Sequence, residues 1–142
     1  MTPAQIQRVR KSFAAAVLKL DEVSAGFCQR LRRLDPSMVA FGGDPVAQRI
    51  KVGAALAGLV GSLGQLDRIR PQLQALGRER ARQGVQAEDY AKLGDALIGA
   101  LEQALADDFD QETRRAWISA YGMVARTMMG GTDSGRLAAQ AA

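Results

Sequence analysis

The chain has 142 residues, of which 47% are apolar, 5% aromatic and 24% charged, a composition typical of a single globular domain. It contains no histidine, which excludes imidazole acid–base chemistry and imidazole metal ligation. Cys28 is the single cysteine, so no disulfide can form within the chain, and we expect a reducing, cytoplasmic location. No apolar run is long enough to span a bilayer, and no secretory signal is seen, so we expect no membrane insertion.

The formal charge of +4 is distributed unevenly along the sequence. Residues 1–85 carry 14 lysines and arginines against 6 aspartates and glutamates, whereas residues 86–142 carry 5 against 9. A basic half of this kind can attract an anion, a nucleic acid or an acidic protein. An ordinary solvated surface explains the same asymmetry, so charge alone does not identify a partner.

Helix-start signals and apolar residues at helical spacing predict an all-α protein. Thr2 followed by Pro3 and Gln5 is a capping box, and Asp35 and Asp44 each precede a proline. The predicted helices cover, in order, residues 3–20, 21–34, 36–41, 45–63, 67–83, 87–106 and 111–129. We see no strand pattern and no interdomain linker. The sequence therefore predicts one domain over residues 1–131 and a flexible tail over residues 132–142, after a Gly-Gly helix stop.

One predicted helix, over residues 67–83, carries an anomalous charge. Its apolar residues Ile69, Leu73 and Leu76 share one face, and the next step along that face is Arg80. A helix that buries the three apolar residues would aim Arg80 at the interior. A buried guanidinium is costly unless it is paired, so Arg80 is the residue on which we expect function to depend.

Four segments together resemble the bacterial globins, that is, the single-domain haemoglobins and the globin module of flavohaemoglobins. They are TPAQIQRVRKSF, GFCQRLRRLDPSMVAF, LQALGRERARQGVQAEDYAKLGDALIGALEQAL and RRAWISAYGMVA. The strongest motif is Gly84-Val85 followed by Tyr90, and then Trp117-x-x-Ala120-Tyr121-Gly122. The resemblance covers roughly residues 1–130 and implies a globin-like helical sandwich of helices A, B, C, E, F, G and H.

The resemblance also implies a former haem site whose chemical centre has changed. The position of the proximal histidine corresponds to Arg80, which offers iron no lone pair. The distal tyrosine corresponds to Cys28, and a glutamate of the H helix corresponds to Ser119. The pocket lining implied in this way is Cys28, Phe41, Gln48, Val52, Leu76, Arg80, Tyr90, Leu93, Leu97 and Ser119.

We therefore expect a haem-free globin that acts as a regulatory, sensor or small-molecule-binding module, and neither an enzyme nor an oxygen carrier. We assign no catalytic residues and no cofactor. In this hypothesis Arg80 anchors an apolar molecule that bears a carboxylate, or the pocket is filled by the chain's own side chains. Alternatively, Arg80 reaches the surface or pairs with Glu79 or Asp89.

Two other functions stay open at this point. A haem-binding globin with unusual ligation, for gas or redox sensing, would use Cys28, Lys51, Tyr90 or a methionine as the iron ligand. A small buried hydrophobic role explains Cys28 equally well. A basic surface could instead bind acidic protein or nucleic acid, but few aromatic residues are present for base stacking, so we do not expect nucleic acid. The arginines of that surface are Arg68, Arg70, Arg78 and Arg82.

Two further partners follow from the resemblance. Globin sensors pair through their G and H helices, which implies a homodimer here. The small residues that such an interface would use are Gly94, Ala96, Gly99 and Ala100. A signalling partner protein is expected by analogy with the non-haem globin domains of stressosome sensors.

Overall fold

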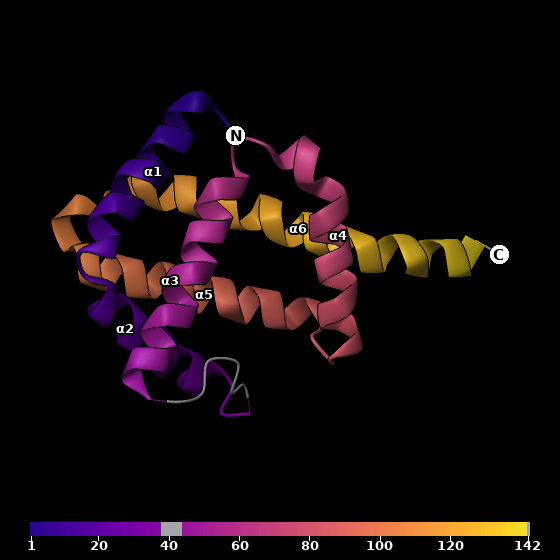
Figure 1. The fold of residues 1–142 in the computed structure, drawn as a ribbon, viewed down its shortest axis with the longest axis horizontal. Helices are drawn as coiled ribbons and strands as arrows, with labels where there is room; N and C mark the ends of the chain where they lie inside the picture. Colours follow the sequence, from indigo (N-terminus) through magenta and orange to yellow (C-terminus); the bar gives the residue numbers. More distant parts are fainter. Residues whose placement is uncertain (38–43, 142) are drawn as a thin grey trace.

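The computed structural model describes the backbone of residues 1–37 and 44–141 and the side chains of this part up to Gly130, and all its regular structure is helical. The helices are α1 Pro3–Val17, α2 Leu20–Leu34, α3 Pro45–Ser62, α4 Leu66–Arg82, α5 Ala87–Leu105 and α6 Gln111–Ala141, with a 3-10 turn at Ala106–Asp108. Figure 1 shows α5 and α6 running across the molecule, with α3 and α4 crossing over them. The predicted all-α fold class is confirmed.

Side chains cap the starts of three helices, two of them at the predicted signals Thr2 and Asp44. The Thr2 hydroxyl accepts a hydrogen bond from Gln5 N, and the Gln5 side chain accepts one from Thr2 N, which completes the capping box. Asp44 Oδ1 accepts from Ala47 N at 2.8 Å, and Asp110 Oδ1 accepts from Thr113 N at 2.8 Å. These bonds satisfy N–H groups that have no partner within a helix, so α1, α3 and α6 begin where the sequence predicts.

A buried indole connects the first helix to the last. Trp117 of α6 is fully buried, and its Nε1 donates a hydrogen bond of 2.7 Å to Ser12 Oγ of α1. The Ser12 hydroxyl in turn donates to the carbonyl oxygen of Arg8 at 2.7 Å. Because the indole N–H is satisfied, the large ring can occupy the centre of the core without an unpaired polar group.

The contact between α4 and α6 passes through Gly77, the buried residue of α4. A Cβ atom at this position would overlap the backbone carbonyl of Met128 in α6. The two helices therefore approach backbone to backbone, which a glycine allows and a larger residue does not.

This contact determines which face of α4 is buried. With about 100° of rotation per residue, Leu76 and Arg80 both lie on one flank, about 100° and about 60° from the direction of Gly77. Leu76 is 42% exposed and Arg80 is exposed. The prediction that these two side chains point into the interior is therefore wrong: Ile69 and Leu73 of the same stripe are half-buried, whereas Leu76 and Arg80, nearer the end of α4, are exposed.

The C-terminal part of the chain also differs from the prediction. The sequence predicts that the last helix stops at Gly130-Gly131, whereas α6 continues to Ala141. In Figure 1 this helix extends past α4 to the C-terminus. The proposed division into a domain at 1–131 and a flexible tail at 132–142 stays a prediction, and the short helix expected at 36–41 falls mostly outside the described residues.

An ion pair joins the end of α2 to α5. Lys92 Nζ lies 2.9 Å from Asp35 Oδ2, and Ser37 donates to Asp35 Oδ1 from both its hydroxyl, at 2.6 Å, and its backbone N–H, at 3.0 Å. The hydrogen bonds from Ser37 and Lys92 lower the pKa of Asp35 to about 2. The folded state therefore favours the ionised carboxylate more strongly than the unfolded chain does.

We expect Gly77→Ala to destabilise the fold by about 1–3 kcal/mol, because the added methyl group forces α4 and α6 apart. The measurement is the free energy of unfolding in urea, followed by circular dichroism. Gly58→Ala in α3 is the matched control, since a Cβ there meets nothing within 4 Å. This control should be neutral or more stable by up to about 1 kcal/mol. Equal stabilities for the two variants would contradict the close approach at Gly77.

We expect the stability that Asp35 provides to be present above its unfolded pKa of about 3.8 and to be lost as the pH falls through about 2. Asp35→Asn should therefore show a shallower loss of stability between about pH 4 and pH 2 than the unaltered protein. Urea unfolding at a series of pH values measures this. Asp67→Asn is the control, because the Asp67 side chain is 99% exposed and pairs only within α4. It should keep the pH dependence of the unaltered protein.

Candidate functional site

The end of α4 is fixed by a glycine in the left-handed region. Gly84 has φ +97°, its N–H donates to Ala81 O at 3.0 Å, and Val85 N donates to Arg80 O at 3.0 Å. This pair of bonds is a Schellman motif, which terminates a helix and satisfies its last carbonyl groups. The Gly84-Val85 pair therefore places Arg80 in the last turn of α4, at a fixed distance from the start of α5.

The side chain of Arg80 lies at the surface. Its Nη1 donates a hydrogen bond of 3.3 Å to Gln83 Oε1, and both groups are exposed. The two carboxylates considered as partners are engaged elsewhere, because Glu79 pairs with Arg82 and Asp89 accepts from Gln86 N. Arg80 therefore takes the surface arrangement, which keeps its charge in water.

The inner part of the expected pocket is filled with apolar side chains. Cys28, Val52 and Leu97 are buried in one core cluster, and Leu93 packs against it. Burial raises the pKa of the Cys28 thiol, while the nearby Arg32 guanidinium acts in the opposite direction. A thiol in this environment stays protonated at neutral pH and is not a ready ligand or nucleophile.

Two tyrosines connect α5 to α6 beside Arg80. The Tyr121 hydroxyl donates to the carbonyl oxygen of Tyr90 at 2.6 Å, and the Tyr121 ring lies against Gly94. Burial raises the pKa of both phenols, and the Arg80 guanidinium partly counteracts this for Tyr90. Tyr90 and Arg80 are therefore neighbours, and Tyr90 stays neutral at physiological pH.

The other candidate residues that the structure describes lie outside the buried core cluster. Gln48 and Ser119 are half-buried, and Lys51 is exposed on α3. Gln48 and Lys51 each have an interaction partner, so neither is a free polar group. Phe41 falls outside the described residues. The structure thus brings Cys28, Val52 and Leu97 together in the core and places Leu76 and Arg80 on the exposed flank of α4.

The small residues expected at a dimer surface are largely used within the chain. Ala96 and Ala100 are buried, and a Cβ at Gly94 would meet the ring of Tyr121. Gly99 lies against the Arg30 side chain. The homodimer through α5 and α6 stays a prediction, but these residues serve packing inside the monomer.

The structural roles of three residues were not predicted from the sequence. Gly77 is buried in α4, and a buried glycine in a helix is a signal of close helix packing. The bond from Tyr121 to Tyr90 and the bond from Trp117 to Ser12 join residues far apart in sequence, so no local pattern indicates them.

The donor set does not fit a histidine-ligated haem. The chain has no histidine, and within the described residues no three side chains of His, Cys, Asp or Glu are grouped so that they could hold a metal ion. The anionic forms of Cys28 and Tyr90 are disfavoured by burial.

In the described part of the chain, no helix is long and apolar enough to cross a membrane.

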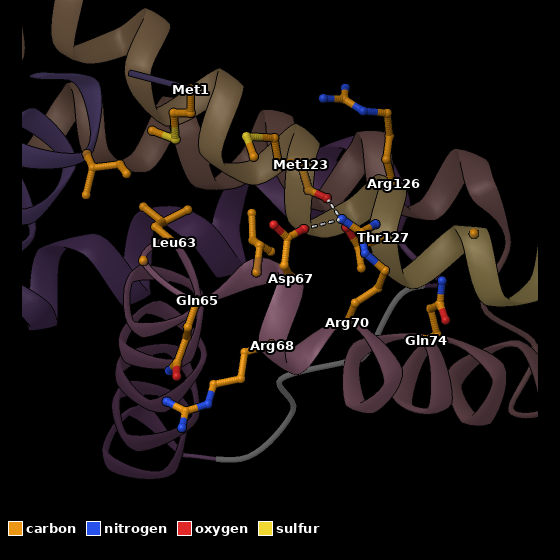
Figure 2. A pocket seen from close by; sticks show the side chains of 14 residues that line it. Met1, Leu63, Gln65, Asp67, Arg68, Arg70, Gln74, Met123, Arg126 and Thr127 are labelled. Atoms are coloured by element: carbon orange, nitrogen blue, oxygen red, sulfur yellow. Dashed lines mark hydrogen bonds and ion pairs between the residues drawn. The ribbon is translucent and has the colours of Figure 1, made fainter. Parts of the chain in front are cut away.

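Two hollows lie away from the expected pocket. One, of about 730 Å³, opens between the N-terminal segment, the turn from α3 to α4, and α6 (Figure 2). The other, of about 700 Å³, lies among Arg30 of α2, the middle of α5 and Ile118 of α6. Neither is lined by any of the ten residues expected at the former haem site.

Comparison with known proteins agrees with this architecture. Residues 41–128 match the family model described as Globin. The chain is 28% identical over 83 residues to a flavohemoprotein of Bacillus subtilis (strain 168), which covers 58% of this chain and 21% of that protein. It is also 28% identical over 81 residues to the neuroglobins of Dissostichus mawsoni and Chaenocephalus aceratus, covering 57% of this chain and 51% of each.

The chain thus spans about a fifth of the flavohemoprotein and about half of each neuroglobin. The family model, by contrast, covers well over half of this chain and includes α3, α4, α5 and most of α6. These are the helices that hold Arg80, Tyr90 and Tyr121. The chain belongs to the globin family.

Proposed function

We propose that this globin does not form a histidine-ligated haem complex and that it acts as a non-enzymatic regulatory or small-molecule-binding module. One observation carries the proposal: the sequence contains no histidine. By the resemblance, Arg80 occupies the position of the proximal ligand. Its guanidinium stays protonated and cannot donate a lone pair to iron. The proposal includes the cytoplasmic location expected from the single, buried cysteine.

The environments of the alternative ligands support the proposal. Thiolate and phenolate are the forms in which cysteine and tyrosine bind haem iron. Burial raises the pKa of Cys28 and of Tyr90, so both side chains are protonated at neutral pH. Haem ligation by either residue would require both deprotonation and rearrangement of a packed core.

The exposed flank of α4 supports a ligand-binding version of the proposal. Leu76 and Arg80 are one helical turn apart, on the same flank, and both are exposed. An apolar molecule with a carboxylate end could contact Leu76 and bind the Arg80 guanidinium in the bidentate manner. The weak Gln83 contact, at 3.3 Å between exposed groups, is easily replaced by such an anion.

We expect the purified protein to give no sharp, stoichiometric Soret band when haemin is added, while its circular dichroism remains helical. The physical reason is the lack of an imidazole ligand at any position. Absorption titration measures this directly. A sharp stoichiometric band that shifts in Cys28→Ala or Tyr90→Phe would overturn the proposal in favour of a haem globin with an unusual ligand.

We expect Arg80→His to gain no stoichiometric Soret band, because the side chain at position 80 lies on the exposed flank of α4 and the inner part of the expected pocket is filled by apolar side chains. Arg78→His is the matched control: it places the same group on the same helix, about 200° around the axis from position 80, and should gain no such band. A stoichiometric band in Arg80→His alone would show that haem can still enter the former pocket, and would contradict the filled interior. If both respond equally, haemin binds nonspecifically to surface imidazole.

A further inference from the structure

The outward side of α3 carries an apolar face along the length of the helix. Five residues lie within about 80° of one another around the helix axis, on the side away from the buried core. They are Val46, Ile50, Ala54, Ala57 and Gly61. None of the five is charged or polar, and all are exposed, with the two large side chains, Val46 and Ile50, 58% and 63% exposed. We call these five residues the outer face of α3.

The described part of the chain leaves this outer face uncovered. A Cβ atom added at Gly61, or at the neighbouring Gly58, would meet no heavy atom within 4 Å. In Figure 1, α3 lies in front of α5 and α6. The solvent-facing side of a helix normally carries polar and charged side chains, so a continuous exposed apolar face of this kind marks an interaction surface.

The sizes of the side chains on the outer face favour a second helix as its partner. Ala54, Ala57 and Gly61 are small and allow a close approach of two helices, whereas a lipid surface is bound through large side chains such as Leu, Phe and Trp. The large residues Val46 and Ile50 occupy only the N-terminal half. Antiparallel pairing of two α3 helices therefore places large side chains over the glycine-containing half of the other copy, and the face is complementary to itself.

The charges beside the outer face are arranged for the same pairing. Positions 49 and 64 lie on one flank of α3, within about 60° of each other and about 22 Å apart along the axis. Beside Arg49 lies the carboxylate of Asp21 from α2, with 3.2 Å between Nη1 and Oδ1, and this aspartate side chain is 81% exposed. At the other end, an Arg10 guanidinium nitrogen lies 3.0 Å from the position of a Cβ added at Gly64.

Arg10 is available to a partner. It is exposed, and it makes no ion pair with another residue whose side chain the structure describes. A twofold axis perpendicular to two antiparallel helices brings each flank against the same flank of the other copy, in the reverse direction. Asp21 of each copy then lies toward Arg10 of the partner subunit, so opposite charges meet twice in one dimer.

We propose that the chain forms a twofold homodimer in which the outer face of α3 packs antiparallel against the same face of a second copy. Ala54 of each copy faces Gly61 of the partner subunit, and Asp21 faces the partner's Arg10. One helix from each copy buries less than the roughly 800 Å² per partner of a standard interface, so we expect a dissociation constant on the order of 10–100 μM. The dimer uses α3 and not the α5 and α6 surface, and it does not depend on the proposed loss of haem chemistry.

Sedimentation equilibrium of the whole chain, from about 1 μM to about 500 μM, tests the dimer. Ile50→Arg should raise the dissociation constant by about tenfold or more, because it places a charge in the apolar interface. Ile118→Arg is the matched control, since it makes the same change at an exposed isoleucine of α6. This control should dimerise as the unaltered protein does, and circular dichroism checks that both variants stay helical. Loss of the dimer in Ile118→Arg but not in Ile50→Arg would place the interface on α6 and overturn the proposal.

A charge exchange tests the antiparallel arrangement. Arg10→Glu and Asp21→Arg should each weaken dimerisation by about threefold or more, because like charges then meet at both contacts. An equimolar mixture of the two variants should dimerise more tightly than either variant alone, since both contacts of the mixed pair join opposite charges. A mixture no tighter than the separate variants would show that positions 10 and 21 do not meet, and would overturn the proposed pairing.

A lipid surface is the competing occupant of the outer face. The unaltered chain should be dimeric at about 500 μM and should not bind vesicles of phosphatidylcholine and phosphatidylglycerol in a flotation assay. A chain that stays monomeric at this concentration overturns the proposal. If that monomer binds the vesicles, and Ile50→Arg does not, the outer face contacts lipid instead.

Discussion

The backbone contact between Gly77 of α4 and Met128 of α6 is the constraint on which the placement of α4 and of the larger hollow depends. It brings the two helices to a separation that no side chain larger than glycine allows. That contact turns Gly77 toward α6, and Arg80 lies exposed on the flank of α4. The same contact holds the first half of α4 opposite α6, and the hollow lined by Arg68 and Arg126 lies between them.

A densely packed core is formed by the other α-helices. Trp117 is buried at the centre with its N–H bonded to Ser12, and Cys28, Val52 and Leu97 share one cluster. Such a core deforms little, and α4 packs against α6 outside it. The residues that the resemblance assigns to a former haem site therefore include a filled apolar interior and an exposed cationic helix end.

The surface of the chain also carries unevenly distributed positive charge. The basic part of the sequence, residues 1–85, supplies Arg10, Arg68 and Arg70 around one hollow, and α6 adds Arg126. Asp67 pairs with Arg70, so a carboxylate offsets part of this positive charge. The uneven charge seen in the sequence thus becomes, in the fold, a localised patch around the larger hollow.

The sequence by itself determined the starts of α1 and α3, the end of α4 and the family, because apolar spacing, Thr2, Asp44 and the Gly84-Val85 stop act through neighbouring residues. It also determined that no imidazole is available. It could not determine which face of α4 is buried, because the apolar stripe Ile69–Leu73–Leu76 competes with the close packing at Gly77, which involves a residue 51 positions away. Likewise, the larger hollow combines residues from α1, α4 and α6, so only the tertiary structure brings them together.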